Sequence, residues 1–122
     1  MPWELDSDRP IYAQIVDRLK HEIVSGFYPP VSRLPSVRDL AAQASVNPNT
    51  MQKAFTELER TGLIVTRRTS GRTVTEDTAL IEQVRSELAE LQISQFLTRM
   101  QHLGYQKDDS IRLLLAKKEE IS

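Results

Sequence analysis

Residues 34–63 have the sequence LPSVRDLAAQASVNPNTMQKAFTELERTGL, and this stretch decides the fold. A helix is predicted to start at Ser36, whose hydroxyl can accept a hydrogen bond from a free backbone N–H, with Asp39 three residues later completing a capping box. A second helix is predicted to start after Asn47, a favoured cap, because Pro48 suits the first helical position, where no N–H is needed. Two short helices joined by a tight turn indicate a helix-turn-helix.

The second of these helices is predicted to have one apolar and one polar face. Gly62 provides a left-handed stop at its end. Its apolar residues recur at helical spacing and are Met51, Ala54, Phe55 and Leu58. The residues left on the outer face are polar and are Asn49, Thr50, Gln52, Lys53 and Thr56. Amides near a helix N-terminus suit the major groove of DNA, where they pair with adenine edges, although ordinary solvated side chains would give the same pattern.

A β-hairpin is predicted directly after this helix. Residues 63–65 and 73–75 are rich in β-branched side chains, and residues 67–72, RRTSGR, form a turn that carries three arginines. Arginine is favoured next to phosphates and in narrow minor grooves, whereas the hairpin taken alone indicates only a solvated polar turn. The order helix, helix and basic hairpin indicates a winged helix-turn-helix. The predicted fold class is therefore mainly α with a small β-hairpin.

Several segments resemble the GntR family of bacterial transcription regulators. They are PIYAQI at 10–15, LPSVRDLA at 34–41, VNPNT at 46–50, Gly62, and RRTSGRTV at 67–74. The short C-terminal part makes the chain similar to the YtrA subfamily in particular. Val31 and Thr69 depart from the family pattern, since both positions usually hold glycine.

The resemblance implies a sequence-specific DNA-binding transcription regulator. We expect a repressor that binds an inverted-repeat operator as a homodimer, and similarity to the YtrA subfamily implies an ABC transporter operon as its target. The family's DNA contacts, together with the outward-facing Lys53, fall on Arg38, Asn47, Pro48, Asn49, Thr50, Gln52, Lys53, Arg67, Arg68 and Thr69. Two alternatives stay open: a small-molecule effector, and a winged domain that binds a protein partner instead of DNA.

Residues 76–122 are predicted to form a helical dimerisation domain that follows a winged domain at 1–75. Residues 78–103 lack proline and glycine, and a last helix is predicted from Lys107 to Glu119. The apolar side chains expected at the dimer interface are Ile81, Val84, Leu88, Leu91, Phe96, Leu97, Met100 and Leu114. The apolar stripe changes face beyond Leu91, which indicates a bend or contacts with two different surfaces. Two such helices cannot enclose a core, so an identical tail is the expected partner, and folding back onto the winged domain is the alternative.

Composition limits the other functions that the chain could have. With 122 residues, no cysteine and no long apolar run, we expect a cytoplasmic protein without disulfides or membrane spans. The formal net charge of −1 argues against an indiscriminate nucleic-acid binder, yet residues 1–75 hold 10 basic against 8 acidic side chains. His21 and His102 are isolated, and no phosphate-binding loop or catalytic motif is present. We therefore expect no metal, no cofactor and no enzymatic activity.

Overall fold

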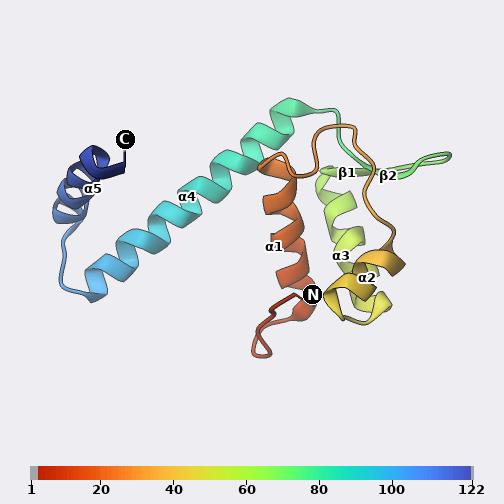
Figure 1. Cartoon of the computed structure of the whole chain (residues 1–122), viewed down its shortest axis with the longest axis horizontal. Coiled ribbons are helices and arrows are strands. Elements are labelled where there is room, and N and C mark those ends of the chain that lie inside the picture. The colour runs from red at the N-terminus through yellow and green to blue at the C-terminus, as the bar shows by residue number, and fades with distance from the viewer. Residues whose placement is uncertain (1–2, 122) are drawn as a thin grey trace. The chain divides into compact units, whose positions relative to one another are not determined.

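The computed structural model describes residues 3–121 and shows a mainly helical chain with a β-hairpin (Figure 1). In chain order the elements are α1 (Ile11–Val24), α2 (Val37–Ala44), α3 (Pro48–Thr61), β1 (Ile64–Arg67), β2 (Gly71–Val74), α4 (Thr78–His102) and α5 (Lys107–Ile121). The predicted winged helix-turn-helix followed by two helices is confirmed. The chain divides into two compact units, Met1–Arg85 and Ser86–Ser122.

The core of the first unit lies where α1 and α2 pack against α3 (Figure 1). Its fully buried apolar side chains include Ile15, Leu19, Leu40, Met51, Phe55, Leu58 and Leu63. Burying each side chain of this size contributes about 1.5–3 kcal/mol, so this cluster is the main source of stability. Because the apolar stripe of α3 lies inside, the helix turns its polar residues outward.

The caps of the helix-turn-helix form as the sequence predicts. Ser36 Oγ accepts a hydrogen bond from the Asp39 N–H at 3.1 Å, and Asn47 Oδ1 accepts one from the Asn49 N–H at 2.7 Å. Between the helices the chain reverses at Ser45, which has a left-handed backbone with φ of 58°. These local bonds satisfy backbone groups that the helix ends leave unpaired, and they fix the turn between α2 and α3.

The wing is the antiparallel pair β1–β2 with an extra segment beside it. Residues 31–34 run along β2: the Val31 N–H donates to Val74 O at 3.1 Å, and the Leu34 N–H donates to Arg72 O at 2.9 Å. A two-stranded hairpin alone is only marginally stable in water. This third segment therefore holds the base of the wing against the helices.

The two departures from the family pattern have different structural outcomes. The left-handed residue at the end of the wing is Gly71, with φ of 72°, and Thr69 is not left-handed. The hairpin therefore turns without needing a glycine at position 69. Val31, in contrast, has φ of 70°, a conformation that costs a β-branched residue strain and costs glycine none.

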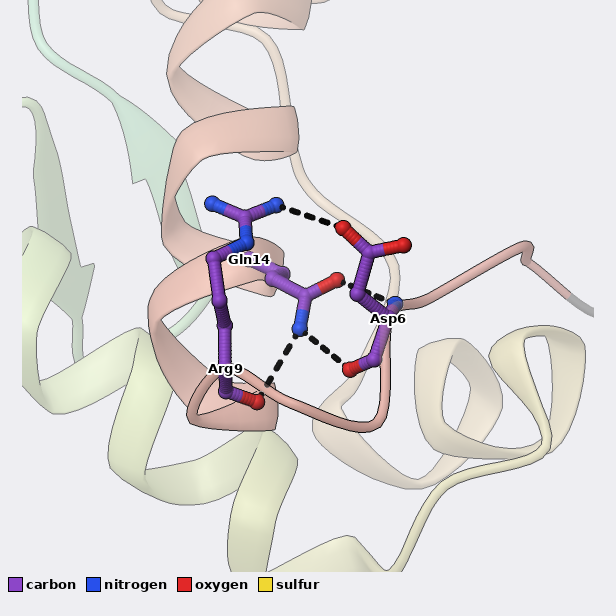
Figure 2. A network of polar contacts seen from close by, with 3 residues as sticks. All are labelled: Asp6, Arg9 and Gln14. Atoms are coloured by element: carbon purple, nitrogen blue, oxygen red, sulfur yellow. Dashed lines mark hydrogen bonds and ion pairs between the residues drawn. The ribbon is translucent and has the colours of Figure 1, made fainter.

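An N-terminal arm is fastened to the start of α1 by the Gln14 amide, as Figure 2 shows. Its Nε2 donates to Asp6 O at 2.7 Å and to Arg9 O at 3.1 Å, and its Oε1 accepts from the Asp6 N–H at 2.7 Å. The Arg9 guanidinium pairs with the Asp6 carboxylate at 3.3 Å. Gln14 is buried, so one side chain satisfies the backbone of the arm that crosses it.

The first turns of α4 belong to the winged unit. The Asp77 carboxylate caps this helix by accepting from the Leu80 N–H at 3.1 Å. Leu80, Ile81 and Val84 are partly buried and pack against the core, so the compact unit extends to Arg85 rather than ending near residue 75. The helix then continues unbroken to His102 in the second unit.

Candidate nucleic-acid interface

The outer face of α3 holds the residues predicted to read DNA. Thr50 is half-buried, and the exposed members are Asn47, Pro48, Asn49, Gln52 and Lys53. The Gln52 Nε2 donates to Thr56 Oγ1 at 3.3 Å, which leaves the amide oxygen and one amide hydrogen of Gln52 unused. An acceptor and a donor on one amide can pair with an adenine edge. The helix N-terminus beside them favours phosphate.

Lys53 lies in a position that its place on the helix does not reveal. Its Nζ sits 4.0 Å from the centre of the Tyr12 ring, so a residue of α1 holds the ammonium group. An exposed cation–π contact contributes only about 0.5–1 kcal/mol. Lys53 can therefore leave the ring at low cost, and in this structure its ammonium group lies over α1.

Arginines of the winged unit divide into two groups. Arg9, Arg18, Arg60, Arg72 and Arg85 each pair with a carboxylate. Within residues 3–85, the exposed arginines with no ion pair are Arg33, Arg38, Arg67 and Arg68. Arg33 lies in the segment before α2, Arg38 lies on α2, and Arg67 and Arg68 lie in the wing. Three of these four arginines, Arg38, Arg67 and Arg68, lie at positions that the sequence predicts to contact DNA.

The wing carries fewer free cations than its sequence suggests. Arg67, Arg68 and Thr69 are exposed, as predicted for a tip that contacts DNA. Arg72, the third arginine of the turn, instead bonds through Nε to Glu59 Oε1 at 2.8 Å. This hydrogen bond, more than the second one from Thr66 Oγ1 at 2.9 Å, lowers the pKa of the Glu59 carboxyl below its usual value.

Arg33 is a candidate that sequence analysis did not identify. Its side chain is exposed and lies beside the wing. The position that a Cβ atom would occupy at Gly71 is 3.8 Å from Arg33 Nε. The pairing of residue 33 with Thr73 brings it there. No local pattern signals this contact, since residues 33 and 71 are joined only by the fold.

The residues predicted for the dimer interface fall on both units. Ile81 and Val84 pack against the core of their own winged unit. In the second unit, Leu88, Phe96, Leu97 and Met100 are half-buried, while Leu91 and Leu114 are each 52% exposed. Phe96, Leu97 and Leu114 line a largely apolar hollow of about 550 Å³ between α4 and α5. The second unit therefore leaves apolar surface uncovered.

The described residues offer neither a metal-binding cluster nor a membrane-spanning helix. None of their His, Asp and Glu side chains form a cluster of three or more that could hold a metal ion. None of the helices between residues 3 and 121 has the length and apolar character needed to cross a bilayer.

A helix-turn-helix with a polar outer face, followed by a hairpin tipped with free arginines, defines a winged helix-turn-helix DNA-binding protein. Residues 11–74 match the family described as "Bacterial regulatory proteins, gntR family". The chain belongs to the GntR family of DNA-binding transcriptional regulators, which is a family of regulators and not of enzymes.

Known relatives extend the match beyond the winged unit. The chain is 34% identical over 108 residues to the uncharacterized regulator YhcF of Bacillus subtilis, covering 88% of this chain and 89% of that protein. It is 39% identical over 100 residues to the transcriptional repressor YtrA of Bacillus subtilis, covering 80% and 76%. A solved GntR family regulator from Listeria monocytogenes has 40% identity and a TM-score of 0.82, covering 92% and 98%.

Proposed function

We propose that this protein is a repressor that binds an inverted-repeat operator as a homodimer. The observation that carries DNA recognition is the segregation of unpaired arginines to α2 and the wing, while arginines elsewhere in the winged unit are neutralised by carboxylates. The likeness to YtrA of Bacillus subtilis, a repressor, supports the direction of regulation. Similarity to that subfamily also supports an ABC transporter operon as the regulated target.

The exposed groups divide into those that read bases and those that bind the backbone. Gln52 and Asn49 offer free amide groups to base edges, and Arg38 offers a guanidinium that suits guanine O6 and N7. Asn47, Pro48, Thr50 and Lys53 surround the α3 N-terminus, where phosphates are favoured. At the wing, the backbone or the minor groove is contacted by Arg67, Arg68, Thr69 and the newly found Arg33.

Dimerisation is proposed from the second unit. Ser86–Ser122 holds only the rest of α4 and α5, which is too little chain to bury its own apolar residues. The exposed fractions of Leu91, Ile111 and Leu114 lie between 43% and 52%. A second copy offers an equal and self-complementary apolar surface about a two-fold axis. Two recognition helices would then address half-sites about one helical turn, or a multiple of it, apart.

Fluorescence anisotropy against the duplex upstream of the protein's own gene and a scrambled duplex, at two salt concentrations, tests DNA recognition. Arg38→Ala should weaken specific binding by about 1–3 kcal/mol if Arg38 reads a base. Arg68→Ala should weaken binding to all sequences and lower the salt slope by about one. Arg85→Ala is the matched control, because Arg85 pairs with Glu82 outside the helix-turn-helix.

Three results would contradict parts of the proposal. Binding that is independent of salt and unchanged by Arg38→Ala would favour a winged domain that docks a protein partner. Light scattering that shows a monomer at every concentration would remove the dimer and with it the inverted repeat. Higher transcription from the bound promoter when the protein is present would show an activator.

A further inference from the structure

Glu59, in the last turns of α3, touches both strands of the wing. Its Oε1 accepts from Arg72 Nε at 2.8 Å, and its Oε2 accepts from Thr66 Oγ1 at 2.9 Å. Thr66 and Arg72 face each other in the β1–β2 register, one pair before Arg67 and Gly71. One carboxylate from α3, the proposed recognition helix, therefore ties the two strands together at the pair next to Arg67.

The environment of this contact differs from that of the helix-surface ion pairs. The side chains of Arg72 and Glu59 are 26% and 32% exposed, whereas Arg85 and Glu82 are 59% and 64% exposed. The Arg72 guanidinium also lies 5.2 Å from the ring centre of Phe55, a fully buried core residue. Arg72 is thus held from two sides by α3, and its position is fixed relative to the core.

We propose that Glu59 is a positioning residue that sets the wing against the recognition helix for DNA binding, an inference that rests on the proposed function. Within the wing, residues 31–34 bond only to the backbone of β2, from Val74 to Arg72, and make no backbone hydrogen bond to β1 in the described part of the chain. The Glu59 contact adds a side-chain bond to each strand, at the pair adjoining Arg67. Without it, the tip must be ordered each time DNA is bound, and that ordering reduces affinity.

Removing the Glu59 charge has an opposing effect that the experiment must separate. A carboxylate near DNA repels phosphate, and its loss frees Arg72 for the backbone, so simple electrostatics predicts tighter binding by Glu59→Gln. Glu57→Gln is the matched control, because Glu57 lies on the same helix and pairs with Arg60 rather than with the wing. Electrostatics therefore predicts that both variants bind DNA more tightly, whereas positioning predicts that Glu59→Gln binds DNA more weakly than Glu57→Gln.

The DNA arm of the test is an anisotropy titration of wild type and both variants, each with and without Arg68→Ala. We expect Glu59→Gln to weaken binding about three- to tenfold, and Arg68→Ala to cost much less in that background than in wild type. The salt slope should fall by about one to two as the wing contacts are lost. Partial unfolding would lower the active fraction without changing this slope.

The second arm needs no DNA. Amide order parameters of residues 66–71 in the free protein should fall in Glu59→Gln and stay unchanged in Glu57→Gln. The positioning role is overturned if the order parameters of the wing are unchanged in Glu59→Gln. It is also overturned if Glu59→Gln binds DNA more tightly, as Glu57→Gln does, and Arg68→Ala has its full effect in that background. Wild type that binds no duplex overturns the proposed function instead, and the order parameters still decide whether Glu59 holds the wing.

Discussion

Replacing Val31 with glycine should stabilise the protein although it removes a side chain. Val31 has φ of 70° at the bend between α1 and α2, and its N–H donates to Val74 O at 3.1 Å. That hydrogen bond holds the backbone in the left-handed region. A β-branched side chain in this region is strained. The Val31 side chain is also 60% exposed, so its packing contributes little stability.

The magnitude follows from three opposing contributions. Relief of the left-handed strain of a β-branched residue is worth about 2–3 kcal/mol. The greater freedom of glycine in the unfolded chain costs about 0.5–1 kcal/mol. Losing the buried two-fifths of a valine costs about 0.5–1 kcal/mol more. Glycine should therefore raise the free energy of unfolding by about 1 kcal/mol, which corresponds to a rise in Tm of about 3 to 6 °C.

Urea and thermal unfolding followed by circular dichroism measure this change. Wild type and variant must be compared at one protein concentration, because association would shift the apparent stability. Val31→Ala is the control: it keeps the Cβ and most of the strain, so its stability should lie within about 0.5 kcal/mol of wild type. DNA affinity should not change, since Val31 lies outside the proposed interface.

Two outcomes would contradict the strain argument. If Val31→Gly and Val31→Ala were both less stable than wild type by about 1 kcal/mol, packing of the valine methyl groups would outweigh backbone strain. If both variants matched wild type, the bend would not hold Val31 in the left-handed conformation in solution.

Further predictions concern the N-terminal arm and the Glu59 carboxyl. Gln14→Leu removes three hydrogen bonds and should destabilise the protein by about 1–3 kcal/mol in urea unfolding, with a change in Trp3 fluorescence, whereas Gln43→Leu on an exposed face should do neither. The Arg72 hydrogen bond lowers the pKa of the Glu59 carboxyl. The stability that this bond contributes is therefore complete at pH values above the usual glutamate pKa of about 4.3, and it is lost as the pH falls through the lowered pKa. The stability difference between wild type and Glu59→Gln should therefore shrink on acidification in that range, and a constant difference would show that the ion pair does not form.

Local chemistry explains why the helix-turn-helix was predictable. Ser36 and Asn47 cap their helices with their own side chains, and each accepts from an N–H two or three residues away. Gly62 ends α3 with φ of 88°. Both partners of each capping interaction lie within a few residues of each other, so the interaction can be predicted from the local sequence.

Contacts between distant segments explain what the sequence did not show. Glu59 and Arg72 are 13 residues apart, and nothing in the RRTSGR turn distinguishes the bound arginine from the free ones. Arg33 meets the wing only because residues 31–34 run along β2. A sequence pattern identifies which residues are charged but not which charges are neutralised by a partner.

The apolar spacing in α4 shows a similar limit. The spacing of Ile81, Val84, Leu88 and Leu91 predicts one apolar face that forms a dimer seam. The structure divides this face at Arg85: Ile81 and Val84 cover the winged core, and Leu91 is exposed. Periodicity shows that a face is apolar, whereas the partner of that face depends on the fold. The proposed dimer therefore depends on residues beyond Arg85.

The positions of the ion pairs also show where a chain of net charge −1 keeps arginines without a carboxylate partner. Carboxylates on α1, α3 and α4 neutralise Arg18, Arg60 and Arg85, and Glu59 neutralises Arg72. Phosphates respond to the local field more than to the summed charge, so under the proposed function Arg38, Arg67 and Arg68 would dominate the attraction to DNA. If these arginines contact DNA as proposed, modest nonspecific affinity should accompany strong dependence on them.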